Sequence, residues 1–241
     1  MFRSFYHKIR MQTWRSKHAV AKFAFESTLP SIAAQLLGEQ TSIRILKDAI
    51  FIQSPGKPGC GFHVDDKGFW PADDESGGIN FWFALSHYTE AEGGGIRVAR
   101  GSHTAKWAKE CRDIIKVAAG EKPRTCNMDE WSPKCNEHLW KVSETHDLEP
   151  GDVILWDRWL FHKGETFRHN DTNTTVSKLR YTIRYIPSNA VAMGIHHGSV
   201  QDGEHYHGHH YPQVWPQVLE SEIKKLSSVG WSIKDRLLPF F

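Results

Sequence analysis

Short apolar runs separated by Gly- or Pro-containing turns make up most of the chain from about residue 41 onward. Runs of this length that are rich in β-branched and aromatic residues are typical of β-strands. Turn signals stand between them, at Gly93-Gly94-Gly95 and at Pro150-Gly151. We therefore expect strands over five stretches: residues 43–52, 79–85, 96–99, 153–156 and 179–186.

Helical spacing of apolar positions occurs ahead of the first expected strand. Ser27 is an N-cap candidate, Pro30 lies in the first turn and Gly38 is a stop signal, so residues 27–37 are expected to form a helix. The more polar residues 104–135 are expected to be partly helical and to form an insertion between strands.

This order of elements predicts a mainly β fold with flanking helices, either an antiparallel sandwich or a barrel. The sequence has no internal repeat and no low-complexity linker, so we expect a single domain over residues 1–241. Within it we expect a helical part at 1–40, a β core at about 41–187 and a His-rich tail at 188–241. A GxGxxG motif is missing, which disfavours a nucleotide-binding α/β fold.

Charge and composition exclude several classes of protein. The formal net charge is only +2, and Lys and Arg are dispersed among acids, so no nucleic-acid partner is expected. No apolar run approaches the roughly 20 residues that span a bilayer, and no secretory signal pattern is present. We expect an intracellular protein, cytoplasmic unless its basic first 25 residues direct it to an organelle.

The four cysteines, Cys60, Cys111, Cys126 and Cys135, are far apart in the sequence and form no CxxC pair. A zinc ribbon or a thioredoxin-like motif is therefore excluded. In an intracellular protein, four reduced thiols are expected.

Fifteen histidines raise the question of a metal site. Two His-x-Asp triplets occur, His63-Val64-Asp65 and His169-Asn170-Asp171, and about one is expected by chance. The second triplet lies in the polar stretch RHNDTNTT, which is typical of an exposed loop. The first follows a Gly/Pro-rich turn, and in an extended segment His63 and Asp65 would point to the same side.

A third ligand is expected from another strand. His162 follows the turn-strand segment LEPGDVILWD within an apolar context. Two imidazoles and one carboxylate on one face leave three coordination positions open, as in iron(II) enzymes that bind a cosubstrate and oxygen together. HExxH is missing, which disfavours a zinc hydrolase.

Iron(II) of this kind usually takes its electrons from 2-oxoglutarate, whose distal carboxylate needs a cation. Arginine is best suited because its guanidinium forks onto both carboxylate oxygens. In the stretch LRYTIRYI, Arg180, Thr182 and Arg184 share one face of the expected strand. Arg180 together with the Thr182 hydroxyl is one candidate clamp, and Arg184 is the alternative.

Five segments in this order resemble the phytanoyl-CoA dioxygenase family of iron(II)/2-oxoglutarate oxygenases. They are GFHVDD (61–66), NFWFALSH (80–87), GGIRVARGSH (94–103), EPGDVILWDRWLFH (149–162) and RYTIRY (180–185). The resemblance implies a double-stranded β-helix, which is a cupin-like jelly roll with the metal at its open end.

The resemblance also assigns roles to individual positions. His63, Asp65 and His162 match the iron ligands, Arg180 matches the arginine that holds 2-oxoglutarate, and Trp82 matches a tryptophan beside that cosubstrate. Two features depart from the family pattern: Arg180 follows His162 by 18 positions, and Glu92 stands where Asn is usual.

The activity that the resemblance implies is hydroxylation of an unactivated C–H in a small-molecule substrate, with O2 as oxidant and release of succinate and CO2. Halogenating relatives lack the carboxylate ligand, so Asp65 favours hydroxylation. Two alternatives stay open: a non-catalytic binding protein on the same fold, and a cupin-like metal oxygenase that does not use 2-oxoglutarate. Substrate identity, oligomeric state and the choice between hydroxylation, desaturation and cyclisation stay open as well.

Other basic residues and histidines are candidates for secondary roles. Arg97, Arg100 and Arg158 would contact substrate if they face inward, which the sequence does not decide. Six histidines between His196 and His210 suggest either a second metal site or, the interpretation we favour, a loop near the mouth of the active site.

Overall fold

The computed structural model describes residues 8–38, 42–65, 69–121, 128–168, 177–193 and 200–216, and the side chains of 116–121 are outside this description. The chain forms two compact units. Unit 1 comprises residues 1–9, 51–65 and 83–180, and unit 2 comprises residues 10–50, 66–82 and 181–241. The chain passes from one unit to the other within four strands, β1 (Lys8–Met11), β2 (Ile43–Gln53), β3 (Ile79–Ala84) and β8 (Lys178–Pro187).

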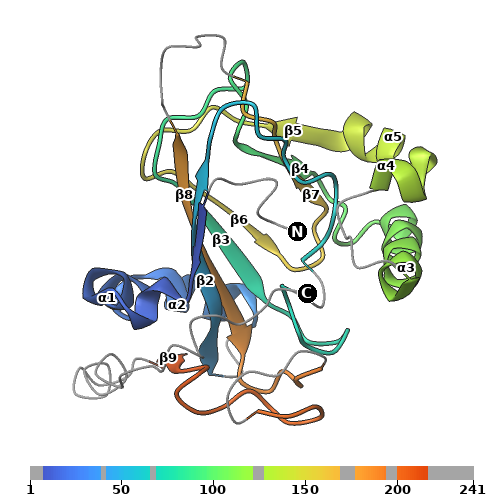
Figure 1. Ribbon diagram of the computed structural model, residues 1–241. Coiled ribbons are helices and arrows are strands. Elements are labelled where there is room, and N and C mark those ends of the chain that lie inside the picture. The colour runs from blue at the N-terminus through green and yellow to red at the C-terminus, as the bar shows by residue number, and fades with distance from the viewer. Residues whose placement is uncertain are drawn as a thin grey trace. The chain divides into compact units, whose positions relative to one another are not determined.

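Two sheets make up the β structure (Figure 1). The six-stranded sheet has the order β1-β2-β8-β3-β6, with β1 at Lys8–Met11 and β6 at Val153–Asp157, and β9 (Gln213–Trp215) pairs with β2. The three-stranded sheet has the order β5-β4-β7, from Ser143–Thr145, Ile96–Ala99 and His162–Gly164, and its strands are antiparallel. The five strands expected from the sequence are β2, β3, β4, β6 and β8.

Unit 1 contains the helical insertion expected between the strands. Its helices are α3 (Lys106–Glu121), α4 (Met128–Trp131) and α5 (Pro133–Val142), and Figure 1 shows them beside β4, β5 and β7. Ser132 caps α5 by accepting a hydrogen bond from the backbone N–H of Cys135 at 3.4 Å, and Pro133 occupies the first turn. Both residues are favoured at a helix start, which explains why α5 begins there.

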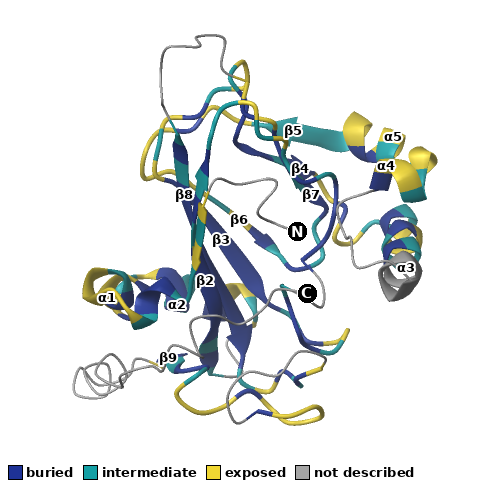
Figure 2. Ribbon diagram, viewed as in Figure 1, coloured by how far each residue is buried: buried dark blue, intermediate teal, exposed yellow. Residues whose placement is uncertain are grey.

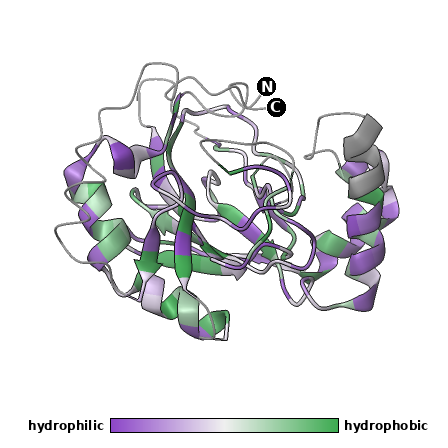
Figure 3. Ribbon diagram, turned by 90° about the horizontal axis from the view of Figure 1, so that it is seen from below, coloured by the Kyte–Doolittle hydropathy of each residue, from purple (hydrophilic) through white to green (hydrophobic). Residues whose placement is uncertain are grey.

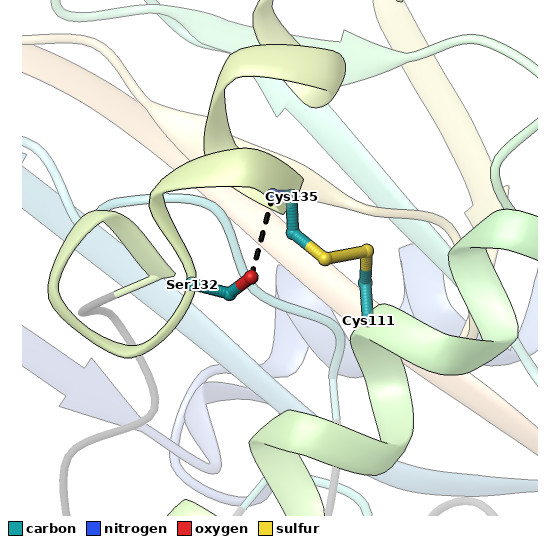
Figure 4. The surroundings of a disulfide bond; sticks show 3 residues. All are labelled: Cys111, Ser132 and Cys135. Atoms are coloured by element: carbon teal, nitrogen blue, oxygen red, sulfur yellow. Dashed lines mark hydrogen bonds between the residues drawn. A yellow bond between two sulfur atoms is a disulfide. The ribbon is translucent and has the colours of Figure 1, made fainter.

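A disulfide joins Cys111 of α3 to Cys135 of α5, with Cα atoms 5.9 Å apart (Figure 4). Cys60 is disulfide-bonded as well. The prediction of four reduced thiols is therefore wrong for these three residues, and Cys126 lies outside the described residues. The physical reason is that helix packing brings together two cysteines whose sequence separation of 24 carries no pairing signal.

The hydrophobic core of unit 1 joins the insertion to the segments around His63 and His162. Phe62, Val64 and Phe161 pack with residues of the helices in one buried cluster, whose other members are Ala99, Ala108, Cys111, Ile115, Met128 and Leu139. Figure 3 shows that these helices carry both hydrophobic and hydrophilic residues. The helices therefore support the chain on either side of the candidate ligands.

Unit 2 contains η2 (Thr13–Arg15) and the N-terminal helices α1 (His18–Glu26) and α2 (Leu29–Leu36). α2 is the helix expected at 27–37, and it is followed by Gly38 at φ +89°. α1 lies within the helical part expected at 1–40, but its bounds were not predicted, and it begins after Lys17 without a side-chain cap. The core of this unit gathers around Leu46, Trp70, Ile186 and Tyr206.

Burial follows the expected strand positions. All six residues of β3 are buried, as the dark ribbon in Figure 2 shows, whereas β6 alternates between exposed Val153 and Leu155 and buried Trp156. No helix among the described residues has the length and apolar content that crossing a bilayer requires. The predicted extent of a single domain over residues 1–241 stays a prediction.

Candidate metal centre

The segment that leads to His63 approaches β7 very closely. It leaves β2 after Gln53 and turns through residues 54–61, and a Cβ on Gly59 would lie 1.7 Å from the carbonyl oxygen of Gly164. Only glycine fits at such a distance. Gln53 Nε2 also donates to the Glu165 carbonyl at 3.2 Å, so both ends of the turn are fixed against β7 and its continuation.

This approach forms an antiparallel bridge between His63 and His162. Each backbone N–H donates to the other residue's carbonyl at 3.0 Å. Directly paired residues project to the same side of a ladder, and the two imidazole centroids lie 4.3 Å apart. His162 is in turn held by β4, where it pairs with Val98.

Asp65 completes a buried group with the two histidines. One possible ligand atom of each residue lies within 4.8 Å of the others, and Asp65 Oδ1 is 3.9 Å from His162 Nε2. The exposed fractions of His63, Asp65 and His162 are 7%, 1% and 4%. Within the described part of the chain, this is the one group of His, Cys, Asp and Glu with metal-binding spacing.

Both imidazoles have the same tautomer. His63 Nδ1 lies 2.8 Å from the Gly61 carbonyl oxygen, and His162 Nδ1 lies 3.0 Å from that of Leu160. A carbonyl only accepts hydrogen bonds, so each Nδ1 carries the proton and each Nε2 presents its lone pair. A backbone acceptor on the distal ring nitrogen is the usual way of orienting a histidine that ligates a metal.

Two further residues contact the histidine rings and were not predicted. Trp156 of β6 lies with its ring centroid 4.7 Å from that of His162, and Cys60 Sγ lies 3.5 Å from His63 Nδ1. Trp156 precedes His162 by six positions on another strand, so no spacing rule relates the two residues.

The two alternative arginines lie in different units. Arg180 is in unit 1, as the three candidate ligands are, and its guanidinium lies 4.6 Å from the ring centroid of Phe51. Arg184 is in unit 2, where its guanidinium lies 5.0 Å from the ring centroid of Phe69. Both arginines are buried. An aromatic face orients a planar guanidinium, so each has a defined side-chain direction.

Trp82 and Thr182, the other predicted 2-oxoglutarate contacts, are both buried in unit 2. Their role stays a prediction.

The three other arginines have different environments. Arg97 pairs across the sheet with Lys163, on the face opposite to Val98 and His162, and its Nε donates to Glu165 at 2.6 Å. The side chain of Arg100 is 80% exposed and forms an ion pair with Glu144. Arg158 is fully buried, with its guanidinium 4.3 Å from the ring centroid of Trp159. Of the three, only Arg158 combines complete burial with a position in the segment that precedes His162.

The remaining histidine hypotheses fall partly outside the described residues. His169, Asp171, His196 and His197 lie there. His205, His207, His209 and His210 are described, and they belong to no group with metal-binding spacing among the described residues.

The donor set fits iron(II). Two neutral imidazoles and one carboxylate on one side of the metal are the arrangement of non-haem iron(II) oxygenases, and they leave three positions for other ligands. A structural zinc site would instead close its shell with four protein ligands, and the described residues supply three.

The sequence matches the phytanoyl-CoA dioxygenase (PhyH) family over residues 4–172. The chain belongs to this family. The predicted family, the enzyme class of non-haem iron(II)/2-oxoglutarate-dependent dioxygenases and the cofactors iron(II), 2-oxoglutarate and O2 are thereby confirmed. No curated protein sequence matches the chain.

Solved structures confirm the predicted double-stranded β-helix fold class. The chain is similar to the non-haem α-ketoglutarate-dependent carbocyclase SnoK from nogalamycin biosynthesis, with a TM-score of 0.67 and 18% identity over 86% of this chain and 75% of SnoK. It is similar to the epimerase SnoN of the same biosynthesis, with a TM-score of 0.62 and 14% identity over 86% of this chain and 77% of SnoN. It is also similar to EctD from S. alaskensis, solved with 2-oxoglutarate and 5-hydroxyectoine, with a TM-score of 0.56 and 17% identity over 78% of this chain and 60% of EctD. At these identities the likeness concerns the fold.

Proposed function

We propose that this protein hydroxylates an unactivated C–H of a small-molecule substrate, with His63, Asp65 and His162 as iron ligands. The observation that carries the proposal is the buried convergence of these three residues, with both Nδ1 atoms bonded to backbone carbonyls. When bound there, iron(II) supplies oxygen activation coupled to the oxidative decarboxylation of 2-oxoglutarate to succinate and CO2.

The protein's own residues supply placement and exclusion of water. The His63–His162 backbone bridge fixes the separation of the two imidazoles, and burial of all three side chains keeps bulk water from their ligand atoms. Arg180 binds the distal carboxylate of 2-oxoglutarate, and the ring of Phe51 holds its guanidinium in one orientation. Its place in unit 1 with the candidate ligands supports Arg180 over Arg184.

Two observations bear on the type of reaction. Asp65 provides a carboxylate ligand, which leaves no position reserved for a halide and supports oxygen insertion. Solved proteins of this fold include a carbocyclase and an epimerase, so the fold accommodates several outcomes. Hydroxylation is the simplest of these reactions, because it requires no second functional group on the substrate.

The deciding experiment measures succinate formed from 2-oxoglutarate by protein loaded anaerobically with iron(II) and then exposed to oxygen, beside a His63→Ala control. Slow turnover that vanishes in the control supports the proposal. If turnover is missing, an anaerobic titration for the metal-to-2-oxoglutarate charge-transfer band separates an enzyme that awaits its substrate from a protein that does not bind the cosubstrate. If the band does not form, two hypotheses remain: a non-catalytic binding protein on the same fold, or a cupin-like metal oxygenase that does not use 2-oxoglutarate.

Arg180→Gln and Arg184→Gln, titrated in the same way, test the clamp. Loss of a bidentate charged contact is expected to weaken 2-oxoglutarate binding by about two orders of magnitude in Arg180→Gln and far less in Arg184→Gln. If neither substitution weakens binding, the assignment of the clamp is wrong.

A further inference from the structure

β8 begins at Lys178, whose ammonium group is buried and hydrogen-bonded. The side chain of Lys178 is only 6% exposed. Its Nζ donates to the His87 carbonyl at 2.6 Å and to Glu92 Oε2 at 2.7 Å. The same ammonium lies 5.3 Å from the ring centroid of Tyr88 and 5.2 Å from that of Phe167. An ammonium taken out of water is retained only where such partners replace its hydration, so Lys178 is confined to this position.

The next residue of β8 is bonded to the same loop. Leu179 N–H donates to Ser86 Oγ at 2.9 Å, and its carbonyl accepts from the N–H of Leu85 at 3.0 Å and from the Tyr88 hydroxyl at 2.9 Å. The loop at 85–92 therefore holds both residues that immediately precede Arg180.

The Glu92 side chain is 44% exposed, but the backbone that carries it is held in place. Its backbone carbonyl accepts from the N–H of Arg168 at 2.7 Å, and its backbone N–H donates to Thr89 Oγ1 at 3.2 Å. The following Gly93 has φ +72°, and a Cβ there would lie 2.1 Å from the Thr166 carbonyl oxygen, so the turn has little freedom to move. The pKa of Glu92 is lowered, mainly by the hydrogen bond from Lys178.

These contacts hold the register of β8 at Lys178 and Leu179, directly before Arg180. The chain reaches Lys178 after a long connection, because Arg180 follows His162 by 18 positions. A slip of one residue in a strand moves every side chain to the opposite face. Such a slip would turn Arg180 away from the Phe51 ring on which its guanidinium lies.

We propose that Lys178 and Glu92 are positioning residues for the cosubstrate: their ion pair fixes the start of β8 and so presents the Arg180 guanidinium to the distal carboxylate of 2-oxoglutarate. This inference rests on the proposed role of Arg180. The ion pair should therefore affect the affinity for 2-oxoglutarate without changing the affinity for iron(II).

The test measures two dissociation constants for each variant under anaerobic conditions. The charge-transfer band gives the value for 2-oxoglutarate on iron(II)-loaded protein, and equilibrium dialysis gives the value for iron(II) alone. The variants are Lys178→Met, which keeps the apolar stem, Glu92→Gln and Arg180→Gln. The matched control is Lys141→Met, which breaks the 2.7 Å Lys141–Glu137 pair on α5, where both side chains are 68% exposed.

We expect Lys178→Met to raise the dissociation constant for 2-oxoglutarate about tenfold, the scale of effect of residues that orient a ligating group. Glu92→Gln is expected to raise it less, because Lys178 keeps the His87 carbonyl and the two rings. The iron(II) constant stays unchanged in both variants, and the control changes neither constant.

An unchanged 2-oxoglutarate constant in folded Lys178→Met would overturn the inference, as would an equal rise of both constants, which indicates general loosening. If Lys178→Met does not fold, Glu92→Gln decides by the same criteria. Failure of the underlying function is distinguishable, because Arg180→Gln would then bind 2-oxoglutarate as the unsubstituted protein does.

Discussion

At the scale of single residues, we expect the candidate metal centre to depend on Gly59, because a side chain at this position would collide with Gly164. Gly59→Ala places a Cβ within 1.7 Å of a backbone oxygen, so the turn must move away from β7. The bridge that aligns His63 with His162 would then open, and metal affinity is expected to fall at least tenfold. Equilibrium dialysis with iron(II) measures the change.

Gly77→Ala is the control for this substitution, because its nearest obstacle is the end of the Leu37 side chain at 3.1 Å, which can move. Equal metal affinities in the two variants would show that the close approach at Gly59 is not what aligns the histidines.

Asp48, in unit 2, gives a prediction about pH. Burial raises the pKa of this carboxyl to about 7 from its ordinary 3.8, although Oδ2 accepts hydrogen bonds from the Trp14 N–H at 3.0 Å and from the Tyr181 hydroxyl at 3.1 Å. The folded-state pKa is therefore above the unfolded value, so the folded state binds more protons between the two. The free energy of unfolding then falls as pH rises through this window.

Asp48→Asn keeps an oxygen acceptor for both donors and does not ionise. Relative to the unsubstituted protein, its free energy of unfolding should rise by about 2.5 kcal/mol between pH 5 and pH 8, because about 1.4 kcal/mol is involved per pH unit below the folded-state pKa of about 7. Urea unfolding at both pH values checks this, with exposed Glu75→Gln as control. If the stability difference between Asp48→Asn and the unsubstituted protein does not vary with pH, the raised pKa of Asp48 is contradicted.

At the scale of elements, the disulfide between α3 and α5 closes a loop of 24 residues in the helical insertion. Replacing both Cys111 and Cys135 by Ser is expected to lower the free energy of unfolding by about 3 kcal/mol, mainly because the unfolded chain gains freedom. Chemical denaturation of both proteins without reductant measures the difference.

The same insertion supports the ligand segment through Phe62 and Val64, which alternate with His63 and Asp65 and pack against the helices. Cys111 belongs to this cluster and Cys135 packs against it, but most of the cluster's side chains are unchanged when both cysteines become Ser. The iron(II) dissociation constant of the double Ser variant should therefore stay within about threefold of that of the unsubstituted protein. Loss of a residue that orients a metal ligand would change it by about tenfold or more. A larger change would mean that the disulfide itself maintains the metal centre.

At the scale of the whole molecule, metal binding should appear as added stability. A ligand that binds only the folded state adds about 2.7 kcal/mol when its concentration is 100 times its dissociation constant. Anaerobic calorimetry with iron(II) is therefore expected to show a higher Tm for the unsubstituted protein and no shift for His162→Ala. A shift of equal size in His162→Ala would indicate that the metal binds elsewhere.

The sequence by itself determined where most strands lie and predicted the residues of the candidate metal centre. β4 spans Ile96–Ala99, as expected, because a short apolar run between turn signals is typical of a buried strand. The bounds of helix α1 were not predicted within the helical part expected at 1–40, because its start after Lys17 has no side-chain cap. His63, Asp65 and His162 were predicted as iron ligands from local context and family resemblance, and the structure brings them together.

Only the tertiary structure decided what lies next to what. His63 and His162 are 99 positions apart, and their pairing depends on a Gly59 approach that no local pattern encodes. The Cys111–Cys135 disulfide and the contact of Trp156 with His162 likewise arise between different elements. Local periodicity reports which side of an element is buried, whereas neighbours across elements are set by the packing of the whole chain.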